Sequence, residues 1–183
     1  MEYGLARLSE LPLCVCLIRE LHENLMDGVR GQHAAPGQFR TTQNWIGRPG
    51  STLQTATYIP PPPGEVEPCL AEWERFLNAS QLPPLATIAL AHYQFEAIHP
   101  FLTGNGRVGR LLITLYLIER KILPTPLLYL SAFFEVSRRD DYECLRAVSE
   151  RGVWREKGPE AFPSERPLVR HLRPGPTLRV LGL

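Results

Sequence analysis

The amino-acid sequence predicts an all-α fold, and three observations support that prediction. Near the N-terminus, leucines recur at every fourth position, which places them on one face of a helix: Leu13, Leu17, Leu21 and Leu25. The segment 108–118 is apolar on nearly every face, a pattern typical of a helix that is buried on all sides. Proline and glycine residues separate these segments and set helix boundaries.

Further helices are expected between and after these segments. Apolar residues recur at helical spacing in 66–77 and 85–98, and Pro83-Pro84 separates the two. Two more helices are expected at 127–135 and 140–150. The segment 55–59 is rich in β-branched and aromatic residues, so it predicts a short strand or half of a hairpin.

The composition divides the chain of 183 residues into two parts. Residues 1–154 have the periodicity and apolar content of one globular domain. Residues 155–183 are rich in proline and arginine and show no periodicity. We therefore expect this tail to be disordered, or to be the product of translation in a shifted reading frame.

Composition also limits the classes of partner and location. The net charge is +1, so no global field draws the chain onto nucleic acid or a membrane, and neither is expected as a partner. The four cysteines show no zinc spacing and are interpreted as reduced thiols. No apolar run approaches the roughly 20 residues that a membrane-spanning helix needs. A cytoplasmic location is the resulting prediction.

A glycine-rich loop before the buried helix predicts an anion site. Gly104 and Gly106 permit backbone angles closed to other residues, so successive N–H groups can converge. A helix is expected to begin at about Arg107, and its free N–H groups point toward the same place. Asn105 adds a side-chain donor, and Arg107 and Arg110 share one face of the first turn. These groups together suit a polyphosphate.

His99 lies at the other end of this loop. Pro100 disfavours α geometry at the preceding residue, so the upstream helix should end at His99. An imidazole that titrates near neutral pH suits a general base. A histidine beside a phosphate site indicates that a hydroxyl attacks a phosphorus atom.

The segment 99–110, His-Pro-Phe-Leu-Thr-Gly-Asn-Gly-Arg-Val-Gly-Arg, resembles the signature of the Fic (Fic/Doc) family. Segments 36–40 and 44–47 resemble the upstream region of the family, and 91–98 resembles the helix that leads into the signature. The resemblance extends over about 1–154 and implies a Fic-like helical bundle with a short β-hairpin flap.

The resemblance also implies an activity and the residues that perform it. His99 would take the proton from a target hydroxyl, which would attack the α-phosphorus of ATP and transfer AMP to the protein. The loop residues would hold the α- and β-phosphates, and the two arginines the remaining phosphate: Gly104, Asn105, Gly106, Arg107 and Arg110. The flap residues Thr57, Tyr58 and Ile59 would dock the target protein by strand addition.

Thr103 departs from the signature, where an Asp or Glu normally holds Mg²⁺. A neutral hydroxyl is a poor ligand for this hard cation, so the role of Mg²⁺ is in doubt and we expect impaired transfer. The chain also resembles an N-terminally truncated family member with an aberrant C-terminus, and the inhibitory helix of many members is not found in it.

Two other functions remain open at this point. His92, Glu96 and His99 are spaced to share one helix face, which would suit a metal-dependent hydrolase, although the spacing is not the His-Glu-x-x-His pattern. Alternatively, the chain is a catalytically degenerate module that binds nucleotide without transferring it, which Thr103 favours.

Overall fold

The computed structural model describes residues 1–27 and 35–125, and its regular elements there are helical, as predicted. In these two ranges the α-helices are α1 (Glu2–Leu8), α2 (Val15–Met26), α3 (Val66–Ala79), α4 (Pro84–Ile98) and α5 (Asn105–Glu119). A 3₁₀ turn, η2, covers Pro63–Glu65.

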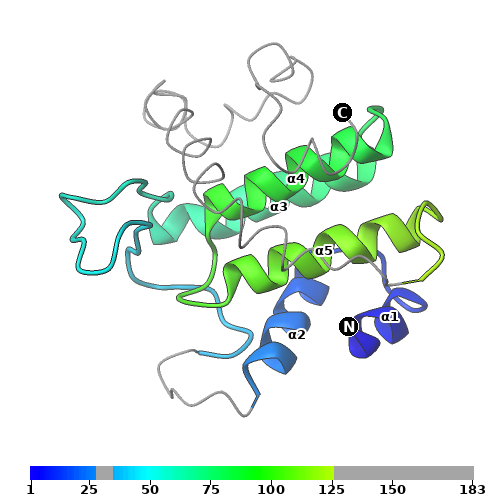
Figure 1. The fold of residues 1–183 in the computed structure, drawn as a ribbon, viewed down its shortest axis with the longest axis horizontal. Coiled ribbons are helices and arrows are strands. Elements are labelled where there is room, and N and C mark those ends of the chain that lie inside the picture. The colour runs from blue at the N-terminus through cyan, green and yellow to red at the C-terminus, as the bar shows by residue number, and fades with distance from the viewer. Residues whose placement is uncertain (28–34, 126–183) are drawn as a thin grey trace.

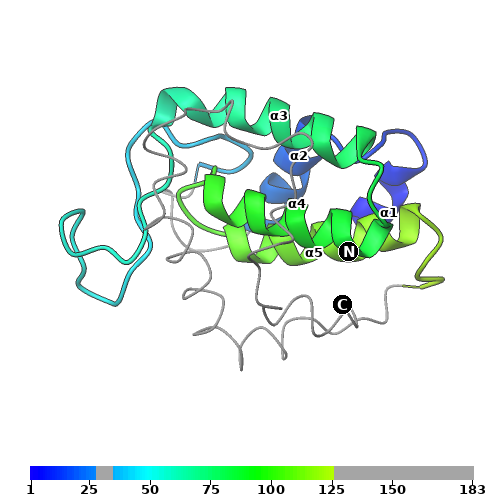
Figure 2. The same cartoon turned by 90° about the horizontal axis from the view of Figure 1, so that it is seen from above.

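Helix α4 lies at the centre of the bundle and packs against both α3 and α5 (Figures 1 and 2). Helices α1 and α2 pack against α5 as well. Between α3 and α4, the Trp73 indole N–H donates to the Ala91 carbonyl at 2.8 Å, and its ring meets Phe95. This buried aromatic contact joins α3 to α4 in the core.

The predicted helices α3, α4 and α5 are confirmed. Each of the four apolar residues that predicted α3 is buried: Val66, Leu70, Trp73 and Leu77. Helix α4 ends at Ile98, before Pro100, as expected. Helix α5 begins at Asn105 rather than at about Arg107, and residues 112–117 are buried around its whole circumference.

The leucine stripe at the N-terminus also corresponds to a helix, α2, although this helix begins after Leu13. Cys14 is its N-cap, and the Cys14 sulfur accepts a hydrogen bond from the Leu17 N–H at 3.4 Å. Leu13 is buried all the same, so it extends the apolar face of α2 into the preceding turn.

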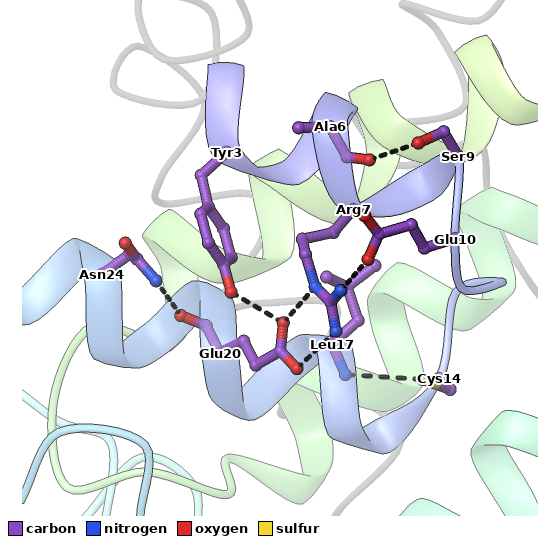
Figure 3. Close-up of polar contacts among 9 residues, drawn as sticks. All are labelled: Tyr3, Ala6, Arg7, Ser9, Glu10, Cys14, Leu17, Glu20 and Asn24. Carbon is purple, nitrogen blue, oxygen red and sulfur yellow. Dashed lines mark hydrogen bonds and ion pairs between the residues drawn. The ribbon is translucent and has the colours of Figure 1, made fainter.

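Helix α1 was not predicted from the sequence, because seven residues are too few to show a clear period. It is attached to α2 by Glu20, whose carboxylate accepts hydrogen bonds from the Tyr3 hydroxyl and from the Arg7 guanidinium, each at 2.8 Å (Figure 3). Gly4 allows the close approach to α5, since a Cβ there would lie 2.9 Å from Leu115.

The predicted β-hairpin flap is not confirmed. Within the described ranges the structure has no strand, and Ile46 and Tyr58 form one isolated antiparallel bridge. The segment between these two residues projects from the bundle in both views (Figures 1 and 2). Pro49, Gly50 and the turns that follow interrupt the pairing after a single bridge.

Other predictions lie outside the described residues: the helices at 127–135 and 140–150, and the tail 155–183. The described helices are all too short or too polar to cross a membrane.

Candidate functional site

The site predicted from the sequence is the segment 99–110, which comprises the loop 99–104 between α4 and α5 and the start of α5. His99 caps α4 with left-handed backbone angles, φ 49° and ψ 60°. Its Nδ1–H donates to the Glu96 carbonyl at 3.3 Å, so Nε2 is the unprotonated nitrogen. Burial lowers the pKa of His99 to about 4. The imidazole is therefore neutral near pH 7 and can accept a proton at Nε2.

The N-terminus of α5 offers unpaired backbone donors. Gly104 precedes it with φ 81°, a left-handed conformation that favours glycine. The N–H groups of Arg107 and Val108 both donate to the Gly104 carbonyl. The N–H groups of Asn105 and Gly106 have no acceptor in the part of the chain that the structure describes, and no side chain there caps the helix. Such a helix start attracts anions.

Arg107 lies in the first turn of α5 and Arg110 in the second, three residues further on. Arg107 is exposed, and its guanidinium donates to the Met26 sulfur of α2 at 3.3 Å. The side chain of Arg110 folds back over Gly106: its Nη1 atom lies 3.4 Å from the position that a Cβ atom on residue 106 would occupy. Two cations at the N-terminal end of a helix oppose its dipole unless an anion binds there.

Two details of the predicted loop are wrong. Gly106 lies inside α5 and does not have positive φ; its missing side chain leaves room for Arg110 instead. The Asn105 side chain is buried and bonds twice to the Phe101 backbone, accepting from its N–H at 2.9 Å and donating to its carbonyl at 2.8 Å. Asn105 therefore shapes the loop with its side chain and presents its backbone N–H at the helix start.

His22 of α2 supports the same loop and was missed by the sequence analysis. Its Nδ1 accepts from the Gly37 N–H at 2.9 Å, and its Nε2–H donates to the Thr103 carbonyl at 3.1 Å. The ring also stacks on Phe101, with centroids 3.8 Å apart. Burial lowers the pKa of His22, so the neutral tautomer that makes both bonds is favoured. A lone histidine on the apolar face of α2 was the available signal.

Arg40 was also missed, although it lies in a segment that resembles the family. It is only 3% exposed, and its guanidinium donates to backbone carbonyls at the end of α4, among them that of His99 at 2.9 Å. An arginine in a polar stretch without periodicity gives no sign of burial, so the sequence held no physical signal for it.

The three predicted target-docking residues differ in exposure. Thr57 and Ile59 are exposed, whereas Tyr58 between them is buried. The Tyr58 hydroxyl donates to the Ala97 carbonyl at 3.0 Å, and burial raises its pKa. The segment is thus extended, with Tyr58 anchoring it to α4 while its neighbours face outward.

The described residues do not form a metal site. Nowhere in 1–27 and 35–125 do three or more His, Cys, Asp or Glu side chains lie where they could hold one metal ion. His92 and Glu96 instead lie against Gly109 of α5, and burial lowers the pKa of His92 to about 4. Thr103 is exposed and presents a hydroxyl rather than a carboxylate, so the residues at this position do not fit Mg²⁺.

Comparisons with known proteins identify the family of the chain and its fold. A model described as the Fic/DOC family matches residues 12–117. Two proteins named protein adenylyltransferase Fic, from Drosophila erecta and Drosophila melanogaster, are 38% and 37% identical to the chain over 126 residues. Each match covers 65% of this chain and 23% of the relative, so the chain spans less than a quarter of their length.

Solved structures have the same fold. A Fic family protein from Desulfovibrio desulfuricans G20 aligns with a TM-score of 0.61 and 26% identity, over 87% of this chain and 46% of that one. A Fic domain containing signaling protein from Bacteroides thetaiotaomicron aligns with a TM-score of 0.64 and 24% identity, over 98% of this chain and 63% of that one.

Proposed function

The chain belongs to the Fic/DOC family, and from this premise we propose that it transfers AMP from ATP to a hydroxyl side chain of a target protein. The observation that carries the proposal is the loop 99–104, which joins a neutral histidine to a helix start with unpaired N–H groups. The nucleotide and the protein target are inferred from the Drosophila relatives, which are named protein adenylyltransferases.

His99 is the general base of the proposed reaction. Its Nε2 takes the proton of a target hydroxyl, and the oxygen attacks the α-phosphorus of ATP. The bond between the α-phosphorus and the bridging oxygen breaks, and pyrophosphate leaves with its electron pair. The hydrogen bond from Nδ1 to the Glu96 carbonyl supports this role, because it fixes the tautomer with a free Nε2.

The start of α5 binds the phosphates in this proposal. The N–H groups of Asn105 and Gly106 receive the α- and β-phosphates beside Gly104, and the helix dipole favours the same charge. The guanidinium groups of Arg107 and Arg110 bind the remaining phosphate oxygens. Catalysis then rests on positioning and charge stabilisation, as in phosphoryl transfer generally.

The exposed side chains of Thr57 and Ile59 lie on the proposed docking edge for the target. In residues 1–27 and 35–125, no backbone group donates to the carbonyls of these two residues. An extended target segment can pair with this edge, which gives affinity without a strict sequence requirement.

No step is assigned to Mg²⁺, since the residues present do not fit it. A second candidate function therefore stays in view, in which the chain binds ATP but does not transfer AMP. The observation that favours it is the neutral, exposed Thr103 at the position where the signature has a carboxylate.

One experiment separates these functions. Purified protein and His99→Ala are incubated with cell lysate and ATP labelled at the α-phosphate. Labelled proteins that appear with the wild type and not with His99→Ala support transfer. ATP binding in both proteins with no labelling in either supports the binding module instead.

A further inference from the structure

Arg40 is a buried cation whose hydrogen bonds converge on the end of α4. Its Nε donates to the His99 carbonyl at 2.9 Å, and one terminal nitrogen donates to the Ile98 carbonyl at 3.3 Å. The same nitrogen donates to the Pro61 carbonyl, and the other donates to the Thr42 carbonyl at 3.4 Å. The Arg40 backbone N–H adds a bond to the Pro100 carbonyl at 2.9 Å.

Backbone carbonyls alone satisfy this charge in the described part of the chain, where no carboxylate pairs with Arg40. Burying a guanidinium without a counter-ion is costly, so a purely structural role would be filled more easily by an apolar residue. The negative end of the α4 dipole offsets part of this cost, because Ile98 and His99 carry the last carbonyls of that helix.

Arg40 binds the main chain of His99, whose backbone conformation is unusual. His99 has a left-handed conformation that side chains other than glycine disfavour. Its carbonyl accepts from Arg40 and also from the Asn44 side-chain amide, at 3.3 Å. Two donors on one carbonyl fix the orientation of the His99 main chain, and through it the position of the imidazole.

Arg40 also connects two parts of the site. Pro61 follows the segment that carries Thr57 and Ile59, and Arg40 bonds to the carbonyls of both Pro61 and His99. A rigid, forked guanidinium can join two such segments, whereas an ammonium cannot reproduce the fixed directions of its donors.

We propose that Arg40 is the positioning residue for His99: its guanidinium holds the His99 main chain in the left-handed conformation and fixes it relative to the docking segment 57–59. This inference rests on the proposed function, since it assigns a role in that reaction. The charge of Arg40 supports it further, because it adds to burial in lowering the pKa of His99 and so favours the neutral base.

The test compares Arg40→Met, Arg40→Lys and the wild type in AMP transfer, with ATP affinity measured separately. Arg40→Met should lower kcat by about 100-fold, since misplacement of a reacting group by about 1 Å can cost that much. The affinity for ATP should stay within twofold of the wild type, because Arg40 does not contact the start of α5. Arg40→Lys should recover part of kcat, since it keeps the positive charge and one of the three donor nitrogens.

Two control variants and a second test variant accompany Arg40→Met. Arg75→Met makes the same replacement at an exposed arginine of α3 and should leave kcat unchanged. Trp73→Phe removes the bond to Ala91 in the core, so it lowers the melting temperature without a matching loss in kcat. Asn44→Ala removes the longer of the two hydrogen bonds to the His99 carbonyl, together with one to the Phe101 carbonyl. It should lower kcat relative to the wild type, so the role of the held His99 carbonyl is tested even if Arg40→Met does not fold.

A spectroscopic measurement tests the proposal independently of transfer. In the wild type, imidazole nitrogen NMR should show His99 as the tautomer protonated at Nδ1, and Arg40→Met should show a mixture of tautomers. An unchanged tautomer together with unchanged kcat would overturn the proposal, as would equal losses in kcat and ATP affinity. If the wild type transfers no AMP, the proposed function fails, while the tautomer of His99 still decides the role of Arg40.

Discussion

At the scale of single residues, Thr103 is the position where the chain departs from the family signature. Its backbone carbonyl is held by His22, while its side chain is exposed. The backbone of the loop is therefore fixed by groups other than the Thr103 side chain. A different side chain of similar size can be accommodated without rearranging the site.

Thr103→Asp should increase AMP transfer in the presence of Mg²⁺, because the carboxylate adds a ligand for the cation. An additional stabilisation of the transition state by about 1.4 kcal/mol would raise kcat about tenfold. The measurement is the rate of labelled AMP transfer at several Mg²⁺ concentrations. Thr103→Asn is the matched control, since it has nearly the same shape without the charge; an equal gain in both variants would rule out a missing metal ligand as the cause.

Sequence reasoning predicted the backbone at the two ends of the loop but not the groups that support it. His99 and Gly104 were identified correctly as a helix end and a left-handed glycine, because Pro100 and the missing Cβ act locally. His22 and Arg40 act across the fold, so their roles follow from packing that the local pattern does not encode. Asn105 was assigned a phosphate contact, whereas its side chain turns inward to Phe101.

At the scale of elements, α4 and α5 pack closely at Gly109 of α5, which has no side chain. A Cβ on Gly109 would lie 2.6 Å from the Glu96 carboxylate and 3.0 Å from the buried ring of His92. The glycine thus permits the close packing of the two helices on either side of the loop 99–104. The N-terminal end of α5, which we propose binds phosphates, and the end of α4 that carries His99 are placed together by this contact.

Gly109→Ala should destabilise the protein by about 1 kcal/mol or more, because overpacking a buried contact costs more than alanine gains in helix propensity. Gly64→Ala is the matched control, since a Cβ there meets nothing within 4 Å. Urea denaturation of both variants measures the change. Equal stability of Gly109→Ala and the wild type would show that α4 and α5 can separate locally without cost.

The elements themselves were predictable in proportion to their length. Helices α3, α4 and α5 span 14 or 15 residues each, long enough for a helical period to show in the sequence. Helix α1 has only 7 residues, too few to show a period, and its attachment depends on Glu20, which lies outside it in α2. The flap was expected as a hairpin from the β propensity of 55–59, but pairing extends over one bridge only in the described residues.

At the scale of the whole molecule, the fold holds three histidines in the neutral form. Burial lowers the pKa of His22, and it lowers the pKa values of His92 and His99 to about 4. In the unfolded chain these side chains bind protons near pH 6.5. Below that pH, the unfolded state therefore takes up more protons than the folded state, and the free energy of unfolding decreases as pH falls.

Stability should accordingly be constant above about pH 7 and decline from pH 6.5 toward pH 4. Urea denaturation at intervals of half a pH unit measures this decline. His22→Gln removes one of the three groups, so its decline should be less steep than that of the wild type even if its stability at pH 7 is lower. A variant with the same slope as the wild type would contradict the buried, neutral state of His22.

In the proposed reaction, the start of α5 binds the phosphates of ATP while His99 activates a hydroxyl against the α-phosphorus. Transfer from ATP labelled either at the α- or at the γ-phosphate tests this reaction. Target proteins should acquire the α-label and never the γ-label, and His99→Ala should abolish the labelling. Transfer of the γ-label, or α-labelling that persists in His99→Ala, would contradict it.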